Sequence, residues 1–355
     1  MNNNMQKKIL KGGERMRKKS IAMLVLVIFA ISIALTGCSG GSKSQPQKEE
    51  KPKVAQLFLL TGSTGGTYYP LGGAMANTWN KHLAGKVQVT SQPSGASVEN
   101  LKRIGKGEAQ LGMAMNNIAD QAWKGEGDAF KDTGAIKNFR TIGVIYPEVY
   151  QGIAAADSKI ESIADLKGKK VAIGPTGSGT AVISKDIFAE YGLKLEDFKP
   201  EYAGFGDAAG KFKDGHIDAN FGVLSVPAAA IQDVMTVRKI KIIEIKGDMF
   251  EKLKAKYPFF SQYVIPAGTY GNEKDAYTIN MQAALYCKAD LPEDLVYDLT
   301  KVFYEQSAEI AAAHAAGKYI KLEKALDGIT TPLHPGAVKY YKEKGIKIPD
   351  NIMPK

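Results

Sequence analysis

The chain has 355 residues, of which 44% are hydrophobic and 24% charged, and its formal net charge is +10. Residues 1–37 hold seven of the 47 basic and one of the 37 acidic residues, which leaves 40 bases, 36 acids and a net charge of +4 for the rest. The basicity therefore belongs largely to the N-terminal segment, and it does not indicate a nucleic-acid partner.

The N-terminus has the order of a secretory signal. A basic stretch up to Lys19 precedes an apolar run from Ile21 to Leu35, which a single serine interrupts. This run is shorter than the ~20 apolar residues that span a membrane. It ends in Leu-Thr-Gly-Cys38, which resembles a lipobox. We predict a lipoprotein signal peptide over residues 1–37 and a lipid on Cys38, with an uncleaved N-terminal anchor as the alternative.

A polar segment follows this signal. Residues 38–53 are rich in Gly, Ser, Pro and charge, so they predict a flexible tether. The body is then expected outside the cytoplasm, lipid-anchored to the cell membrane in the periplasm or on the outer face. Cys287 is the only other cysteine, so no internal disulfide is expected. Either Met1 or Met16 can be the start.

Apolar runs of strand length alternate with segments of helical period from residue 54 onward, which favours a parallel α/β architecture. The predicted strands are Val54–Leu60, Val87–Ser91, Leu111–Met115, Lys170–Ile173, Ile217–Phe221 and Ile240–Ile245. The predicted helices are Tyr68–His82, Val98–Lys106, Ala181–Tyr191, Asp207–Asp214, Val226–Val237, Met249–Lys256 and a long one over Pro292–Ala313.

Two strand-like stretches interrupted by Pro or Gly, Arg140–Ala156 and Gln262–Cys287, differ from the strand–helix units. They are typical of a chain that crosses from one lobe to another and back. We therefore predict two lobes of about 300 residues in all, since single cores stop growing near ~250 residues. Lobe one would comprise residues 54–145 with 271–355 returning to it, and lobe two residues 146–270.

Three glycine-rich turns follow predicted strands and lead into helices. They are Thr61–Pro70 (TGSTGGTYYP), Gln92–Ser97 (QPSGAS) and Gly174–Thr180 (GPTGSGT). Glycines allow sharp turns, hydroxyls donate hydrogen bonds, and a helix start offers free N–H groups with partial positive charge. Each turn alone also occurs for structural reasons. Three turns at the carboxyl ends of strands in opposite lobes favour an anion site between the lobes.

Single residues in these turns have competing interpretations. Tyr68 and Tyr69 could both pack in the core, but successive helical positions diverge by about 100°, so one can face the cleft while the other is buried. We assign Tyr68 to the ligand. Ser97 can cap a helix, with Asn100 three residues on. Asn116 can reach the cleft, and Asn117 is interpreted as the cap of the next helix.

Enzymatic and metal functions are not indicated. The Gly174–Thr180 turn lacks the lysine that a nucleotide-binding P-loop requires. The Gly-Cys-Ser-Gly-Gly match to a nucleophile elbow straddles the cleavage site, so it is accidental. The four histidines show no paired-ligand spacing, and His334 is interpreted as a structural hydrogen bonder. We expect no catalysis, no cofactor and no metal.

These motifs follow one another as in a known family. TGSTGGTYYPLGGAMA at Thr61, SGASVENLKRIGKGEAQLGMA at Ser94, GPTGSGT at Gly174, KDGHIDANF at Lys213, IPAGTYGNEKD at Ile265 and LHPGAVKYYKEKG at Leu333 cover nearly the whole mature chain. In this order they resemble the TAXI family of receptors for tripartite ATP-independent periplasmic (TRAP) transporters. Asn117, where that family often has aspartate, and Ser225, in a turn that is commonly small and glycine-containing, depart from its pattern.

The resemblance implies a two-lobed periplasmic-binding-protein fold with two hinge crossings, closure on the ligand and delivery to a TRAP-type permease driven by an ion gradient. It also implies a small carboxylate ligand, either an acidic amino acid or a dicarboxylate such as glutamate or 2-oxoglutarate. The chain is expected to be a monomer. The alternatives are a binding lipoprotein of an ATP-driven importer or of a sensor system, and an exported hydrolase. The predicted ligand-binding residues are Ser63, Thr64, Gly65, Tyr68, Ser94, Gly95, Ala96, Asn116, Thr176, Gly177, Ser178, Gly179 and Thr180.

Overall fold

A computed structural model describes residues 54–354 of the chain. The predicted signal peptide, the predicted lipidation site Cys38 and the predicted tether lie outside these residues. Within residues 54–354, no helix combines the length and the apolar character that crossing a membrane requires.

The described chain alternates strands and helices. The strands are β1 (Ala55–Leu60), β2 (Val87–Gln92), β3 (Leu111–Met115), β4 (Phe139–Ala155), β5 (Lys170–Ala172), β6 (Lys199–Glu201), β7 (Ala219–Leu224), β8 (Ile240–Ile243), β9 (Ser261–Ile265) and β10 (Ala276–Lys288). The helices are α2 (Tyr68–His82), α3 (Ser97–Gly105), α4 (Asn116–Lys124), α5 (Gly179–Glu190), α6 (Phe205–Lys213), α7 (Ala229–Met235), α8 (Asp248–Lys256), α9 (Glu293–Glu305), α10 (Ser307–Ala313) and α11 (Pro335–Glu343). Short 3₁₀ helices cover Ile163–Leu166, Leu195–Asp197, Ala315–Tyr319, Leu322–Lys324 and Asp350–Ile352.

The strands form a mixed sheet in the order β2-β1-β3-β10-β4-β7-β5-β6, with β8 paired to β4 and β9 paired to β10. β1, β2 and β3 are parallel, as are β5, β6 and β7. β10 runs antiparallel to β3 and β4, and β4 runs antiparallel to β7. The prediction of a parallel sheet is therefore correct only within each lobe, because the chain passes between lobes on strands of opposite direction.

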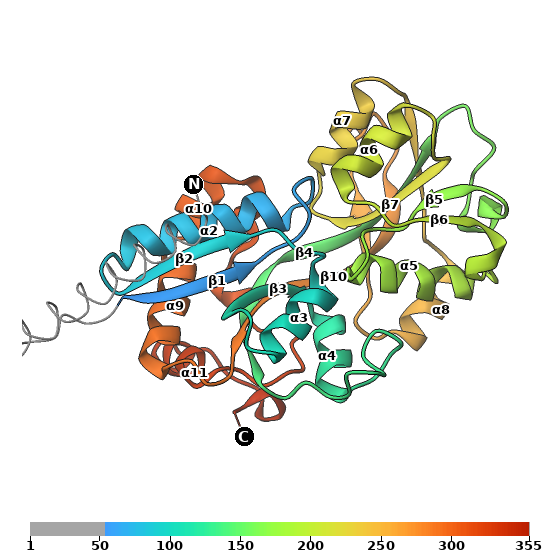
Figure 1. The fold of residues 1–355 in the computed structure, drawn as a ribbon. Coiled ribbons are helices and arrows are strands. Elements are labelled where there is room, and N and C mark those ends of the chain that lie inside the picture. Colours follow the sequence, from blue (N-terminus) through green and yellow to red (C-terminus); the bar gives the residue numbers. More distant parts are fainter. Residues whose placement is uncertain (1–53, 355) are drawn as a thin grey trace, which may run out of the picture. The chain divides into compact units, whose positions relative to one another are not determined.

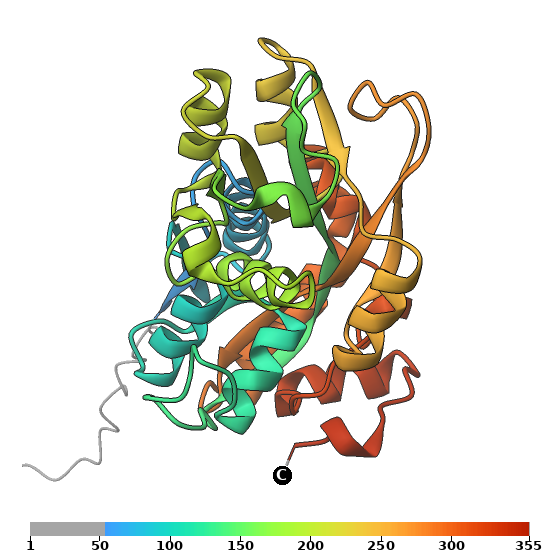
Figure 2. The same ribbon diagram turned by 90° about the vertical axis from the view of Figure 1, so that its right-hand side faces the viewer.

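The two crossings are the long strands β4 and β10, which pair with each other from Phe139 to Val149 (Figure 1). β4 continues past this ladder to pair with β7 and β8 in the second lobe. Figure 2 shows α6 and α7 of the second lobe at the top and α3, α4 and α11 of the first lobe at the bottom, with these long strands running between the two levels. The chain thus has the two-lobed fold with two hinge crossings that the sequence predicts.

The hydrophobic core follows these strands from one lobe into the other. One cluster of buried side chains extends from α2 and β1 through β4 to Phe188 and Phe221 in the second lobe. There Tyr150 of β4 stacks on Phe221 at 5.6 Å between ring centroids. A second cluster packs α6 and α7 on the other face of β7. The hinge strands are therefore packed within the core that both lobes share.

The predicted long helix over Pro292–Ala313 is wrong. The structure has two helices, α9 and α10, separated at Gln306, whose backbone (φ −106°, ψ 19°) leaves the helical region. The break lets the buried face of α9, with Leu299 and Phe303, pack on α2 through Trp79. Ile310 of α10 can then turn toward a different part of the core.

Candidate functional site

A cavity lies where the two lobes meet. The first lobe and β4 contribute Gly62, Ser63, Gly66, Thr67, Tyr68, Ala96, Ser97, Met115, Tyr146 and Glu148, and the second lobe contributes Ser178, Gly179, Thr180, Phe205, Val223 and Leu224. We call this space the interlobe cavity. Its volume is about 20 Å³, above the ~10–15 Å³ that one water needs but too small for a larger solute. A solute can therefore enter only when the lobes separate.

Helix starts from both lobes reach this cavity. α2 begins at Tyr68 after the first glycine-rich turn, and α5 begins at Gly179 after the turn of the second lobe. Ser178 caps α5, because its Oγ accepts a hydrogen bond from the amide of Ala181 at 3.0 Å. Within residues 54–354, the amides of Gly179 and Thr180 have no hydrogen-bond partner. They are free donors at the positive end of a 12-residue helix.

The Gln92–Ser97 turn contributes differently from the prediction. Ala96 has φ 77°, a left-handed conformation, and α3 begins directly after it. The Oγ of Ser97 accepts a hydrogen bond from the amide of Met115 at 3.2 Å, so it ties α3 to the end of β3. The prediction that Ser97 caps the helix is wrong, because Ser97 lies inside it.

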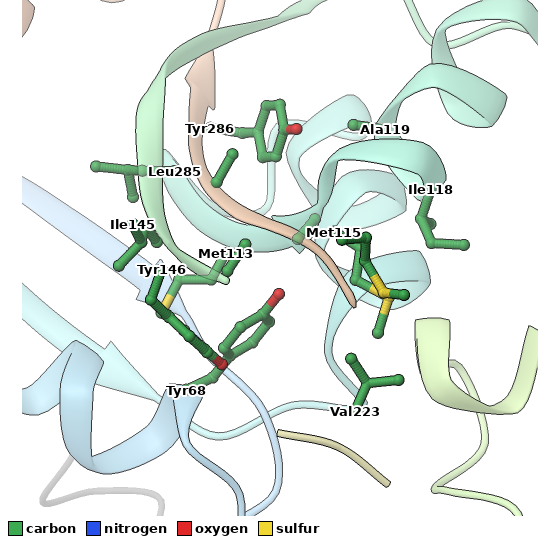
Figure 3. Close-up of a cluster of buried hydrophobic side chains, with 14 of the residues drawn as sticks. Tyr68, Met113, Met115, Ile118, Ala119, Ile145, Tyr146, Val223, Leu285 and Tyr286 are labelled. Carbon is green, nitrogen blue, oxygen red and sulfur yellow. The ribbon is translucent and has the colours of Figure 1, made fainter. Parts of the chain in front are cut away.

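A buried acid lies in the cavity wall between two tyrosines. The Glu148 side chain is 2% exposed and accepts hydrogen bonds from the hydroxyls of Tyr68 at 2.7 Å and Tyr146 at 3.1 Å. The two rings meet edge to face at 6.2 Å between centroids. Figure 3 shows them side by side, close to Met113 and Met115. Tyr68 of the first lobe and the hinge strand β4 thus form a wall with a carboxyl at its centre.

Burial governs the charge of this acid. It raises the pKa of Glu148 from its ordinary 4.5 to about 8, although the hydrogen bonds from Tyr68 and Tyr146 act in the opposite direction. Burial, with the negative charge of Glu148, also raises the pKa values of both tyrosines well above their usual range. Burial therefore favours the protonated form of all three groups at neutral pH. Glu148 is the only ionisable residue besides the tyrosines among those lining the interlobe cavity.

Direct contacts hold the lobes together on both sides of the cavity. On one side Thr67 Oγ1 lies 3.1 Å from Ser225 Oγ and accepts a hydrogen bond from the Ser225 amide at 3.0 Å. On the other side the Glu99 amide donates to the carbonyl of Gly177 at 3.1 Å. Gly65 lies so close to α6 that an added Cβ would be 2.4 Å from the Gly206 amide nitrogen. The structure is therefore the closed arrangement of the lobes.

The predicted site residues divide into two groups. Those that line the interlobe cavity are Ser63, Tyr68, Ala96, Ser178, Gly179 and Thr180. Thr64, Gly65, Ser94, Gly95, Thr176 and Gly177 do not line it. Gly65, Gly95, Thr176 and Gly177 lie where the lobes touch, and the Ser94 hydroxyl donates to Asn100 Oδ1 at 2.6 Å.

The two asparagines after β3 lie away from the cavity lining. Asn116 donates from its side chain to the Gly328 carbonyl at 2.8 Å and accepts from the Gln282 amide at 3.2 Å. Both ends of its amide are thus engaged. Asn117 lies within α4, and its Oδ1 is buried without a partner among the described residues. The interpretation of Asn117 as a cap is wrong, because α4 begins one residue earlier.

The tyrosine pair at the start of α2 also differs from the prediction. Tyr68 is buried at the cavity, but Tyr69 is 37% exposed and does not pack in the core. Sequence reasoning missed Tyr146 and Glu148, since the β4 segment was interpreted only as a crossing. The available signal was a single acid inside a mostly apolar strand, which is unusual because buried charges are costly.

Metal ligands do not gather here. No group of three His, Cys, Asp or Glu side chains suited to a metal ion occurs in residues 54–354. His334 caps α11 by accepting from the Gly336 amide at 3.1 Å, and its other ring nitrogen lies 3.1 Å from the Leu291 carbonyl. It therefore has the structural role that the sequence predicts.

Comparison with known proteins places the chain in a family. Residues 59–345 match the model of the NMT1-like family. The chain belongs to the NMT1-like family. This match covers both lobes, the hinge strands and every residue that lines the interlobe cavity. The site therefore belongs to the part of the chain that family members share.

A solved structure with low sequence identity shares the fold of this NMT1-like chain, and two further structures resemble it with lower scores. PhnD1 from Prochlorococcus marinus in complex with methylphosphonate is 11% identical over 75% of this chain and 91% of that chain, with a TM-score of 0.51. A binding protein component of an ABC phosphonate transporter from Pseudomonas aeruginosa is 11% identical over 76% and 81%, with a TM-score of 0.48. The periplasmic aliphatic sulphonate binding protein SsuA from Escherichia coli is 16% identical over 84% and 90%, with a TM-score of 0.42.

The resemblance to the TAXI receptors of TRAP transporters is wrong, because the family whose model matches residues 59–345 is the NMT1-like family. The prediction of a TRAP-type permease as the partner rested on this resemblance, so it is wrong as well. Glutamate, 2-oxoglutarate and other dicarboxylates, which rested on that resemblance, have no support as ligands. Short glycine-rich turns after strands serve many binding proteins of this fold, so they could not separate the families.

Proposed function

We propose that this chain is an extracytoplasmic solute-binding protein of an ABC-type importer, that it is not an enzyme, and that it captures a small anionic solute between its lobes. The cavity that both lobes enclose carries this proposal. The free amides at the start of α5, together with the Ser178 and Thr180 hydroxyls of the cavity wall, suit an anionic oxygen. Tyr68 and Glu148 form the opposite wall.

Closure supports the same function. Solute-binding proteins deliver their cargo only if a partner can distinguish the loaded from the unloaded state. Here the lobe contacts at Thr67, Gly65 and Glu99 surround a cavity that holds about one water. A solute held by both lobes would therefore part them at these contacts, so the loaded and unloaded states would differ in lobe separation. The ABC neighbour of the same fold agrees with transfer to an ABC-type permease.

Thermal unfolding with a panel of small solutes tests the proposal. Lactate, methanesulfonate, methylphosphonate, alanine and arginine are added to the purified mature chain. A solute at 100 times its Kd stabilises the folded state by about 2.7 kcal/mol, which raises the Tm by roughly 5 °C or more. We expect a shift with at least one anion, and no shift with any small solute would contradict the proposal.

Two variants locate the solute. Ser178→Ala removes a hydroxyl of the cavity and the cap of α5, and Tyr68→Phe removes the hydroxyl opposite. We expect Ser178→Ala to weaken binding about tenfold or more, since a charge-assisted hydrogen bond contributes roughly 1.5 kcal/mol or more. Tyr68→Phe should also weaken it, because Glu148 in the cavity wall loses a hydrogen-bond donor. Ser162→Ala is the control, because Ser162 caps the remote 3₁₀ helix Ile163–Leu166 in the same way. Unchanged affinity in both cavity variants would place the solute elsewhere.

A further inference from the structure

Glu148 with Tyr68 and Tyr146, here called the Glu148 cluster, has one hydrogen that its internal hydrogen bonds do not use when the carboxyl is protonated. Glu148 contacts two hydroxyls, from Tyr68 and Tyr146, and each contact uses one hydrogen. When Glu148 is ionised, the only hydrogens available are those of the two tyrosine hydroxyls, and each is donated to one carboxylate oxygen. When Glu148 is protonated, its own hydrogen is a third, and it needs a hydrogen-bond acceptor beyond these two contacts. The interlobe cavity that Glu148 lines is the open direction.

The surroundings of Glu148 provide no positive charge. Tyr68 faces it from α2 and Tyr146 from β4 itself, and Tyr286 of β10 is close enough to sense its charge. Ser97 lies beside the Tyr68 hydroxyl. No Lys, Arg or His belongs to the residues that line the cavity. A buried anion next to an ionised Glu148 would therefore create two unpaired negative charges, which low polarity makes very costly.

We propose that Glu148 binds the solute as a protonated carboxyl, donates its spare hydrogen to an anionic oxygen, and restricts the cavity to solutes with a single negative charge and no cationic group. This inference rests on the proposed function and names the solute class of the same site. The amides of α5 bind the anion from the second lobe, while Glu148 selects it from the first. A solute with an ammonium group would instead require Glu148 to be ionised.

Binding of such an anion is linked to one proton. The affinity is constant while Glu148 holds its proton and falls up to tenfold per pH unit above its pKa, because the proton must then be restored on binding. Burial already favours the protonated form at neutral pH. With a pKa of about 8, the anion binds roughly tenfold more weakly at pH 9 than at pH 7.

Infrared spectroscopy of the solute-free mature protein tests the protonation directly. The difference spectrum between the native chain and Glu148→Gln at pH 6.5 should contain the C=O band of a protonated carboxyl, and this band should disappear above about pH 9. A carboxylate band at pH 6.5 would overturn the proposal. This readout needs no ligand, so it stands even if the solute panel fails and the proposed function is wrong.

Titration calorimetry with lactate and alanine tests the solute class, because the two differ only in a hydroxyl or an ammonium group. We expect lactate to bind more tightly than alanine and to lose roughly tenfold in affinity from pH 7 to pH 9. In Glu148→Gln the amide still donates to the solute, so lactate affinity should change less than threefold between these pH values. Preference for alanine, or loss of all binding in Glu148→Gln, would overturn the proposal.

Discussion

At the scale of single residues, Glu148 is the position where the cavity departs from ordinary core packing. Its neighbours on β4 are buried and mostly apolar, and an acid among them is tolerated because two tyrosine hydroxyls satisfy its oxygens. Removal of either hydroxyl leaves a buried acceptor with fewer partners. Glu148, Tyr68 and Tyr146 thus form a polar cluster inside the core, and each relies on the others for its hydrogen bonds.

This burial predicts a pH dependence of stability. The pKa of Glu148 is raised from 4.5 to about 8 in the folded chain, so between these pH values the folded state keeps a proton that the unfolded state has lost. The free energy of unfolding therefore falls with rising pH, by up to about 1.4 kcal/mol per unit, and the fall ends above about pH 8. Denaturant unfolding at pH 5, 6.5 and 8 measures it.

Glu148→Gln is the reference for this measurement, because it keeps the shape of the side chain and cannot ionise. The stability difference between the native chain and the variant should change steadily from pH 5 to pH 8, with the native chain relatively more stable at the acid end. A difference that stays constant across this range would show that Glu148 has an ordinary pKa in the folded state.

At the scale of elements, α2 shows why adjacent glycines are not equivalent. A Cβ on Gly72 would lie 2.4 Å from Cγ2 of Thr61, whereas nothing lies within 4 Å of a Cβ on Gly73. Thr61 cannot turn aside easily, because its hydroxyl donates to the Gln92 carbonyl at 2.7 Å and its side chain is fully buried. Gly72 therefore sets how closely α2 packs on β1.

The matched variants Gly72→Ala and Gly73→Ala test this packing. Gly73→Ala should raise the free energy of unfolding by about 0.5–1 kcal/mol, since alanine favours the helix. Gly72→Ala should lower it by about 1–2 kcal/mol, because the overlap with Thr61 outweighs that gain. Denaturant midpoints at constant m-value measure both effects. Equal shifts of the same sign would contradict the close approach of α2 to β1.

At the scale of the whole molecule, closure depends on contacts that each lobe makes only with the other. The Gly65 turn meets the start of α6 with no room for a side chain. The paired hydroxyls of Thr67 and Ser225 lie beside this contact. A solute that enters the cavity must therefore part the lobes at these contacts.

Gly65→Ala is predicted to oppose closure. The added methyl would overlap the Gly206 backbone, so the solute-free protein, which makes this contact, should lose about 1–3 kcal/mol of its free energy of unfolding. Denaturant unfolding measures the change. Gly210→Ala, in the same helix α6 with nothing within 4 Å, is the control and should not be destabilised. Equal stability of both variants would mean that the Gly65 turn does not pack against α6 in the solute-free protein.

Much of the fold followed from local sequence patterns. The bounds of α2 and β3 agree with the prediction at both ends, and most other strands and helices agree to within a few residues. Alternation of apolar runs and helical periodicity depends on neighbours within one turn or strand, which the sequence shows directly. The break at Gln306 was not predictable in this way, because it arises from the packing of α9 on α2 and β4.

The candidate site shows the same division. The sequence by itself determined two of its parts, the glycine-rich turns before α2 and α5, because helix starts have local signatures. Only the tertiary structure decided that these turns share one cavity and that Glu148 lies between them. The hydrogen bond from Tyr68 to Glu148 joins residues 80 positions apart. Such a contact, and the burial that keeps the acid protonated, exists only after the hinge strands have brought both lobes together.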